Sequence, residues 1–188
     1  MKKKLFLILM LCAASQAGAL ELAGAKLDET LQLDGHQLVL SGVGLRTKYF
    51  FKVYVAGLYL GEKMHTSAAV LADSGPKRML FHLLRDVSGT QMLEAINTSF
   101  PQNTSAEEMK ALKPRLSEFS KIFASVGAIR KGEEITFDFV PPSGTVVTVG
   151  GVVKGRIEGA DFNRALLKMW VGDKPAQADL KKNLLDGE

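Results

Sequence analysis

The sequence predicts an α+β domain in which a layer of helices covers one face of a mostly antiparallel sheet. Runs rich in Val, Leu, Phe and Tyr occupy the first part of the chain, and two helix-start patterns follow them. Apolar and polar residues then alternate again before a last pair of helical stretches. One layer of helices on one sheet leaves a cleft between them, which is the expected place for a ligand.

The N-terminus has the three parts of a secretory signal peptide. Lysines at residues 2–4 precede an apolar run at residues 5–14, and small residues follow up to Ala19. This layout predicts cleavage after Ala19, so that residues 1–19 are a signal peptide. A single membrane anchor is the alternative, which the short apolar run disfavours.

The remaining residues, 20–188, contain no internal repeat and no linker, so we expect a single domain. Without the three lysines of the signal, 21 basic side chains face 20 acidic ones, and no basic cluster indicates nucleic-acid binding. The only cysteine, Cys12, lies in the predicted signal, and the bulky Leu11 before it disfavours a lipid anchor. We therefore expect a periplasmic protein without disulfides or stable membrane insertion, which depends on its core for stability.

Three apolar runs predict strands at residues 37–45, 49–60 and 77–84. Glycines interrupt the first two runs at Gly42, Gly44 and Gly57. Glycine inside a strand indicates a bend, a bulge or a close approach of another backbone segment.

Two capping boxes predict the middle helices. In each, a serine is followed three residues later by a side chain that can reach back to it, Ser88 with Gln91 and Ser105 with Glu108. Apolar residues then recur every three or four positions, as on the buried face of a helix. Pro114 lies inside the second pattern and is expected to kink or divide that helix.

Alternation returns at residues 135–140, and the turn sequence PPSG at 141–144 leads into a valine-rich strand at 145–149. A last strand is expected near 152–157. Helices are then predicted from about residue 161 and at about 176–185, because apolar residues recur there at helical spacing.

The stretch GVGLRTKYFFKVYVAGLYL, residues 42–60, resembles the N-terminal strand pair of the chalcone isomerase fold. The strand at 77–84 followed by Ser88-Gly89-x-Gln91, and the sequence FNRALLKMWVG at 162–172, resemble later parts of the same family. The resemblance extends over about residues 40–185 and is greatest to the bacterial, exported chalcone isomerase-like branch. It implies an open-faced sandwich.

The resemblance also implies a site. In the enzymes of this family, a strand arginine polarises the substrate ketone and holds the phenolate, and Arg46 occupies its position. The enzymes' threonine aligns with Tyr54, their tyrosine with Met92, their helix asparagine with about Ser99, and their late Ser or Thr with about Asn163. One position of five is retained.

Met92 decides how this site is interpreted. A thioether has no proton to donate and is a poor acceptor, so Met92 does not replace a phenol in a hydrogen-bonded water network. Loss of one donor to a developing oxyanion typically costs ~3 kcal/mol of transition-state stabilisation. An isomerase or intramolecular lyase that uses Arg46 and Tyr54 on a chalcone-like or other enone substrate is therefore the second hypothesis.

The favoured hypothesis is noncatalytic binding of a small amphipathic carboxylate. Noncatalytic members of the family keep the arginine and bind a fatty-acid carboxylate with it. Arginine matches a carboxylate with two parallel hydrogen bonds. Strand alternation places Phe50 and Tyr54 on the face of Arg46, and the expected lining of a tunnel for the acyl chain is Phe50, Phe81, Met92 and Ile96.

Other interpretations remain open at this point. Arg46 is also explained by an internal ion pair with Asp86, Glu94 or Asp138, and Tyr54 by an ordinary core position. A periplasmic scaffold that binds a partner protein through the exposed sheet face or the C-terminal helix is a third function class. No cofactor is expected, and no metal, because the three histidines are scattered.

Overall fold

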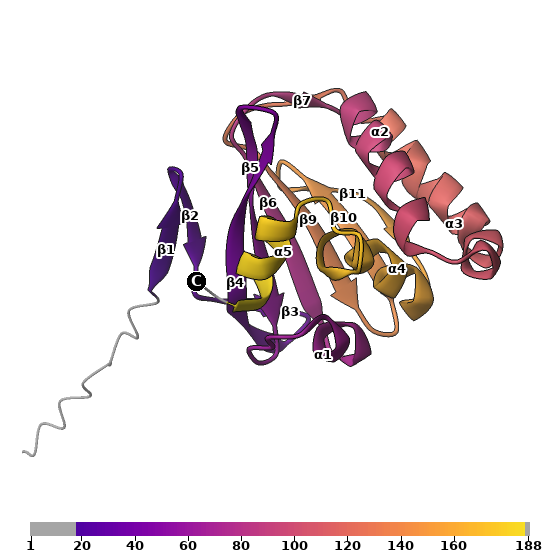
Figure 1. Cartoon of the computed structure of the whole chain (residues 1–188), viewed down its shortest axis with the longest axis horizontal. Helices are drawn as coiled ribbons and strands as arrows, with labels where there is room; N and C mark the ends of the chain where they lie inside the picture. Colours follow the sequence, from indigo (N-terminus) through magenta and orange to yellow (C-terminus); the bar gives the residue numbers. More distant parts are fainter. Residues whose placement is uncertain (1–17, 187–188) are drawn as a thin grey trace, which may run out of the picture.

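The computed structural model describes residues 18–186. A seven-stranded sheet with strand order β11-β10-β9-β6-β5-β4-β3 forms the centre of the protein, and every neighbouring pair is antiparallel (Figure 1). Helices lie on one side of this sheet, so the predicted α+β class and sandwich are confirmed. The predicted signal peptide lies outside the described residues except for its last two positions, and it stays a prediction.

The first half of the sheet follows the predicted strands closely. Strands β4 (His36–Lys48), β5 (Phe51–Leu60) and β6 (Lys77–Leu83) correspond to the three apolar runs, and β3 (Thr30–Leu33) adds an edge strand that was not predicted. β5 begins two residues later than expected because residues 49 and 50 form the turn that joins it to β4. The other half contains β9 (Glu134–Val140), β10 (Gly144–Val149) and β11 (Val152–Ile157), as predicted.

Both predicted capping boxes are present. Ser88 begins α2 (Gly89–Ser99) and Ser105 begins α3 (Ala106–Ala124), each with the reciprocal side-chain bonds of the motif. Pro114 lies inside α3, which continues through it as one helix. The helix is therefore not divided at Pro114, and the other expected effect, a kink, stays a prediction.

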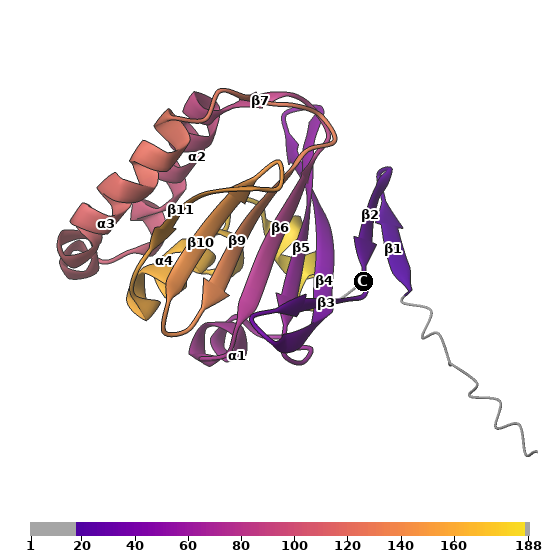
Figure 2. The ribbon, with the colours of Figure 1, turned by 180° about the vertical axis from the view of Figure 1, so that it is seen from behind.

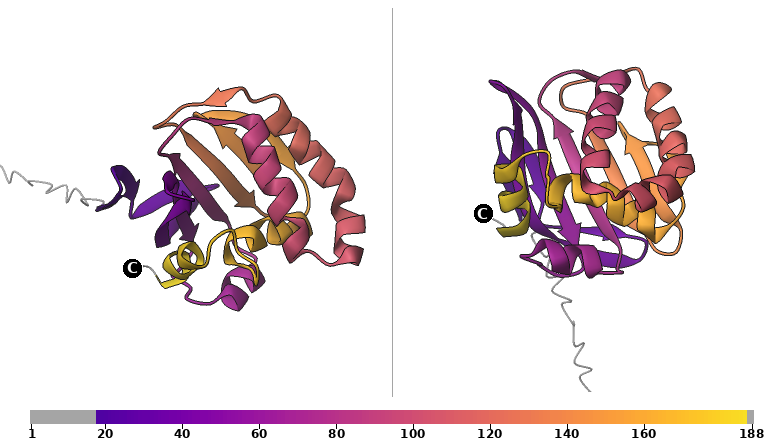
Figure 3. Two further views of the ribbon diagram at one scale, coloured as in Figure 1. Left: turned by 45° about the horizontal axis from the view of Figure 1, so that its top comes forward. Right: turned by 45° about the vertical axis from the view of Figure 1, so that its right-hand side comes forward.

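Two C-terminal helices complete the layer, α4 (Ala160–Val171) and α5 (Ala178–Asp186). The two views in Figure 3 show α2 and α3 side by side over the β11 half of the sheet, with α5 over β4. Glycines make this last contact possible: a methyl group at Gly42 would collide with the Leu184 carbonyl, and one at Gly44 would lie 2.7 Å from Leu180 Cδ1. The expected close approach at these glycines is confirmed.

A hairpin that was not predicted lies beside β4 (Figure 2). Strands β1 (Ala19–Leu22) and β2 (Ala25–Asp28) form it, and Leu27 packs into a second, smaller apolar core behind β4, β5 and β6. A short helix, α1 (Ser67–Ala72), and the two-residue strands β7 (Val87–Ser88) and β8 (Ala128–Ile129) were also missed.

The main core lies between the sheet and the helices and is strongly aromatic. Its rings contact one another at centroid distances of 4.9 to 6.1 Å. Rings in this range contribute beyond their buried area because edges meet faces. The members are Tyr54, Phe81, Phe100, Phe119, Phe123, Phe137, Phe162 and Trp170. Among residues 18–186, no helix is long and apolar enough to cross a membrane.

Candidate functional site

Arg46 lies near the end of β4, directly opposite Tyr54 of β5. Directly paired residues point to the same face of a sheet. Since Tyr54 packs against the helix-side core, Arg46 also belongs to the helix side. Its side chain is partly buried.

A β-bulge between β4 and β5 follows Arg46 immediately. The register shifts between Arg46 and Thr47, so that Thr47 pairs with Lys52 and Val53 is the extra residue. The bulge and the turn after it break the alternation on which one prediction depended. Phe50, expected to line a tunnel beside Arg46, is instead 98% exposed in the turn, and that assignment was wrong.

Gln177, in the segment between α4 and α5, closes the arginine site. Arg46 Nη1 donates to Gln177 Oε1 at 3.1 Å and to the Thr47 carbonyl at 2.6 Å. The same amide oxygen accepts from the Thr47 backbone nitrogen at 2.9 Å, and Gln177 Nε2 donates to the Leu45 carbonyl at 3.3 Å. A neutral amide oxygen therefore occupies the place beside the guanidinium.

None of the three internal carboxylates proposed as partners of Arg46 forms an ion pair with it. Asp138 forms two hydrogen bonds with Arg78, at 2.5 and 2.7 Å, and Asp86 pairs with a loop arginine at 3.0 Å. Glu94 is exposed on α2. Within residues 18–186, no carboxylate forms an ion pair with Arg46. The internal ion-pair interpretation was wrong.

The Tyr54 hydroxyl adjoins the same site. Trp170 Nε1 of α4 donates to it at 3.1 Å. Desolvation raises the pKa of Tyr54, and the Trp170 hydrogen bond and the nearby Arg46 charge lower it by less. Tyr54 is therefore a neutral, hydrogen-bonded phenol beside a cation.

Aromatic rings and apolar side chains fill the space behind Tyr54. Phe81 meets Tyr54 edge to face at 5.1 Å and contacts Trp170 at 4.9 Å between centroids. Ile96 is buried in the same core, and Met92 packs against it. The predicted lining residues Phe81, Met92 and Ile96 thus lie on the helix side, as part of a packed core.

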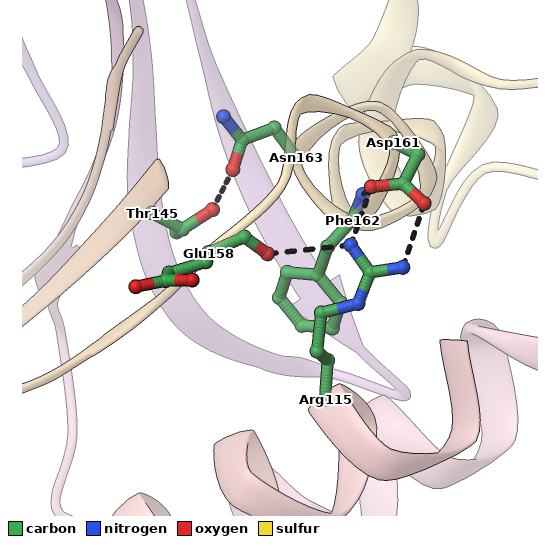
Figure 4. A network of polar contacts seen from close by, with 6 residues as sticks. All are labelled: Arg115, Thr145, Glu158, Asp161, Phe162 and Asn163. Carbon is green, nitrogen blue, oxygen red and sulfur yellow. Dashed lines mark hydrogen bonds and ion pairs between the residues drawn. The ribbon is translucent and has the colours of Figure 1, made fainter. Parts of the chain in front are cut away.

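Two other predicted residues have hydrogen-bond partners other than Arg46. Ser99 ends α2, where its carbonyl accepts from Asn103 Nδ2 at 3.2 Å. Asn163 accepts a hydrogen bond from Thr145, near the far end of the sheet (Figure 4). Thr145 pairs with Phe139 and Phe139 with Lys77 at the start of β6, whereas Tyr54 pairs with Leu83 at its end, so about 20 Å of strand separates the two positions.

Figure 4 also shows a second set of contacts, which does not include Asn163. Arg115 of α3 donates to both carboxylate oxygens of Asp161 at 2.5 and 2.6 Å, and to the Glu158 carbonyl at 3.4 Å. This bidentate pair joins α3 to the start of α4, and Gly159 provides the left-handed turn before the helix, with φ of 97°.

Two surface pockets formed by the described residues lie away from Arg46, which lines neither of them. One, of about 140 Å³, lies by α1 and α4 and includes Asn163, Arg164 and Lys77. The other, of about 320 Å³, is polar and includes Asn103 and Lys168. Within the described part of the chain, no group of His, Cys, Asp or Glu side chains is arranged to hold a metal ion.

The family model described as chalcone isomerase-like matches residues 19–186. The chain belongs to the chalcone isomerase-like family. A fatty-acid binding protein from Arabidopsis thaliana has a similar structure, with a TM-score of 0.69 over 90% of this chain and 96% of that one, at 16% sequence identity. No curated protein matches in sequence. At this identity, the structural similarity establishes the fold that the two proteins share.

Sequence reasoning identified Arg46 and Tyr54 in this chalcone isomerase-like domain but missed two of their partners. Trp170 lay within the family-like FNRALLKMWVG segment and offered a signal, since a buried indole needs an acceptor for its N–H. Gln177 offered none, because a single glutamine before a helix is unremarkable and it is 131 residues from Arg46.

Proposed function

We propose that this protein binds a small amphipathic carboxylate, such as a fatty acid, and that Arg46 is the anchor for the carboxylate. The observation that carries the proposal is the environment of Arg46. A partly buried guanidinium lies on the helix side of the sheet, and the oxygens that it contacts, those of Thr47, Gln177 and the Tyr54 hydroxyl, are neutral. A cation removed from water is strongly stabilised by a counter-anion.

A carboxylate fits this environment better than the amide does. The bonds to Thr47 and Gln177 both use Nη1, so Nε and Nη2 donate in neither of them. A carboxylate accepts two parallel, charge-assisted hydrogen bonds, which are roughly twice as strong as neutral ones. In the proposed complex the ligand displaces Gln177 Oε1 and takes its place beside the guanidinium.

The acyl chain enters the packed core beyond Tyr54. Ligand pockets typically measure about 300–1,000 Å³, so side chains of this core move when the chain enters. Met92 is the adaptable member, because its flexible thioether fills irregular space. Each buried methylene contributes ~0.8 kcal/mol, so the tail supplies most of the affinity and Arg46 the orientation.

The similar structure supports the ligand class. The Arabidopsis thaliana protein, which shares the fold, is a fatty-acid binding protein. The proposed location is the periplasm, supported by the signal-like pattern of residues 1–19. Mass measurement of the exported protein tests that location, and the expected mature N-terminus is Leu20.

Native mass spectrometry of the protein purified from the periplasm of producing cells tests the proposed function. We expect a fatty acid bound to the wild type, identified after extraction, and its loss in Arg46→Ala. The matched control is Arg164→Ala, which removes an exposed arginine from the rim of the 140 Å³ pocket and should retain the acid. Absence of bound acid in the wild type, or equal amounts in Arg46→Ala, would refute the proposal.

A second candidate function is an isomerase or intramolecular lyase. The observation in its favour is the pairing of Arg46 with the Tyr54 hydroxyl, a cation and a phenol that together resemble a site for polarising a carbonyl. Turnover of a chalcone or enone panel that is abolished by Arg46→Ala and by Tyr54→Phe would establish it instead of the binding function.

A further inference from the structure

The β4–β5 turn presents three consecutive aromatic side chains to solvent. Tyr49 is 85% exposed, Phe50 98% and Phe51 61%. Among the described residues, the only other large apolar side chains exposed in this way are Val152 and Val153. Scattered exposed apolar residues are common, but a run of three at one tip indicates an interaction site.

The backbone of the turn holds this tip in an unfavourable conformation. Tyr49 has φ of 56°, in the left-handed region that glycine and asparagine adopt most readily. Burial does not offset the strain, because the Tyr49 ring is exposed. Strain retained at an exposed tip is typical of functional positions.

Positive charge surrounds the aromatic tip. The Arg85 guanidinium lies over the Phe51 ring, 5.3 Å from its centroid. Hydrogen bonds from Leu84 to Val53, and from Gly132 to Leu83, bring two other connecting segments beside the tip. Together, residues 47–52, 84–88 and 126–133 contain five basic side chains and two acidic ones, namely Lys48, Lys52, Arg85, Arg130 and Lys131 against Asp86 and Glu133.

We propose that this tip docks reversibly onto an anionic lipid bilayer. Aromatic rings favour the boundary between headgroups and acyl chains, and flanking lysines and arginines bind lipid phosphates. A second copy of this protein is a poor occupant, because two like-charged tips repel each other. The protruding turn also suits shallow insertion into a membrane better than the flat contact typical of two folded proteins.

Membrane docking would place the proposed ligand site near its source. Arg46 pairs with Tyr54, and the next pairs along the hairpin are Thr47 with Lys52 and Lys48 with Phe51. The guanidinium is therefore on the order of 10 Å of strand from the aromatic tip. This inference about the ligand rests on the proposed function. A fatty acid that leaves the bilayer at the tip reaches Arg46 with its carboxylate end first.

Flotation with vesicles tests the docking. The exported protein, with its N-terminus verified by mass, is mixed with vesicles of phosphatidylcholine alone or of phosphatidylcholine with phosphatidylglycerol. We expect binding to the anionic vesicles that weakens with salt. The combined change Tyr49→Ser, Phe50→Ser and Phe51→Ser should weaken binding at least about tenfold, as should Lys48→Glu with Lys52→Glu.

The matched control is Val152→Ser with Val153→Ser. These exposed valines lie on β11, four strand spacings or about 20 Å across the sheet from β5, and their loss should leave binding unchanged. Thermal unfolding verifies that each variant is folded. Absence of wild-type binding, equal binding of the aromatic variant, or a dimer that the aromatic changes abolish would overturn the proposal.

The membrane-docking proposal and the ligand-site proposal can be refuted independently of each other. Titration of a fatty acid in vesicle-free solution should give the same affinity for the aromatic variant as for the wild type. Arg46→Ala should float with anionic vesicles as the wild type does. Loss of flotation in Arg46→Ala, or weaker fatty-acid binding by the aromatic variant, would overturn the separate roles assigned to the tip and to Arg46.

Discussion

Gln177 Oε1 lies 3.1 Å from Arg46 Nη1, in the position that we propose for an oxygen of a carboxylate ligand. The same oxygen accepts from the Thr47 backbone nitrogen at 2.9 Å. Thr47 Oγ1 donates to it as well, at 3.4 Å, so one neutral oxygen accepts from three donors. In the proposed complex, binding of the carboxylate would exchange this acceptor for a stronger one.

This exchange predicts opposite effects on binding and stability for Gln177→Ala. Removing the competing amide should tighten fatty-acid binding by roughly threefold to tenfold. The free energy of unfolding should fall by about 1–2 kcal/mol, because the bonds to Thr47 and Leu45 are lost. Calorimetric titration and urea unfolding measure the two quantities.

Gln177→Glu is the matched control for the same position. It places a carboxylate beside Arg46, so it should weaken fatty-acid binding relative to the wild type. Equal affinities for the Ala, Glu and wild-type proteins would mean that the ligand does not displace Gln177.

Close packing of α5 on β4 predicts that Gly42→Ala is destabilising. The added methyl group would collide with backbone carbonyl oxygens of α5, which cannot move without the helix. We expect a loss of about 1–3 kcal/mol in the free energy of unfolding and faster amide exchange in residues 178–186.

Gly61→Ala tests whether the effect is specific to that contact. No atom lies within 4 Å of a Cβ placed at Gly61, so this change should leave both stability and amide exchange nearly unaltered. Similar losses in the two variants would argue against the tight helix contact.

Two of the three tyrosines should fail to ionise in the native protein at moderately alkaline pH. Burial raises the pKa of Tyr54 above 10.0, and burial together with nearby carboxylates raises that of Tyr59. A raised pKa means that the folded state favours the neutral phenol. This contribution to stability is complete below about pH 10 and is lost as the pH rises further.

Ultraviolet titration measures the ionisation of the tyrosines. Tyr54→Phe and Tyr59→Phe should each leave the native absorbance change between pH 9 and about pH 11 unaltered, and each should reduce the change in denatured protein. A reduced native change in Tyr54→Phe would contradict the burial of that phenol.

Local chemistry explains which parts of the fold were predictable. Ser88 and Ser105 start their helices with partners three residues away, so a short window of sequence contains the whole interaction. The strands were predictable because the apolar runs and the alternation that indicate them also lie within a short window of sequence. The β1–β2 hairpin was missed because its four-residue strands are stabilised by packing on the back of the sheet, which sequence periodicity does not report.

The site was predictable only in part. The resemblance identified Arg46 and Tyr54, whose pairing depends on one hairpin. Phe50 was misplaced because a bulge and a turn reset the alternation, and neither has a distinctive residue pattern. Gln177 was missed because its contact with Arg46 depends on how α5 docks, which only the three-dimensional structure reveals.

The most direct test of Arg46 as a carboxylate anchor is a fluorescence titration that uses Trp170, the only tryptophan, whose indole bonds to Tyr54 beside the arginine. A long-chain fatty acid and its methyl ester are titrated into the wild type and into Arg46→Gln. We expect Arg46→Gln to weaken binding of the acid by about tenfold or more and to leave binding of the ester unchanged, because only the acid forms charge-assisted bonds. Equal affinity of the two proteins for the acid, or wild-type affinity for the ester as high as for the acid, would contradict the role of Arg46 as the anchor.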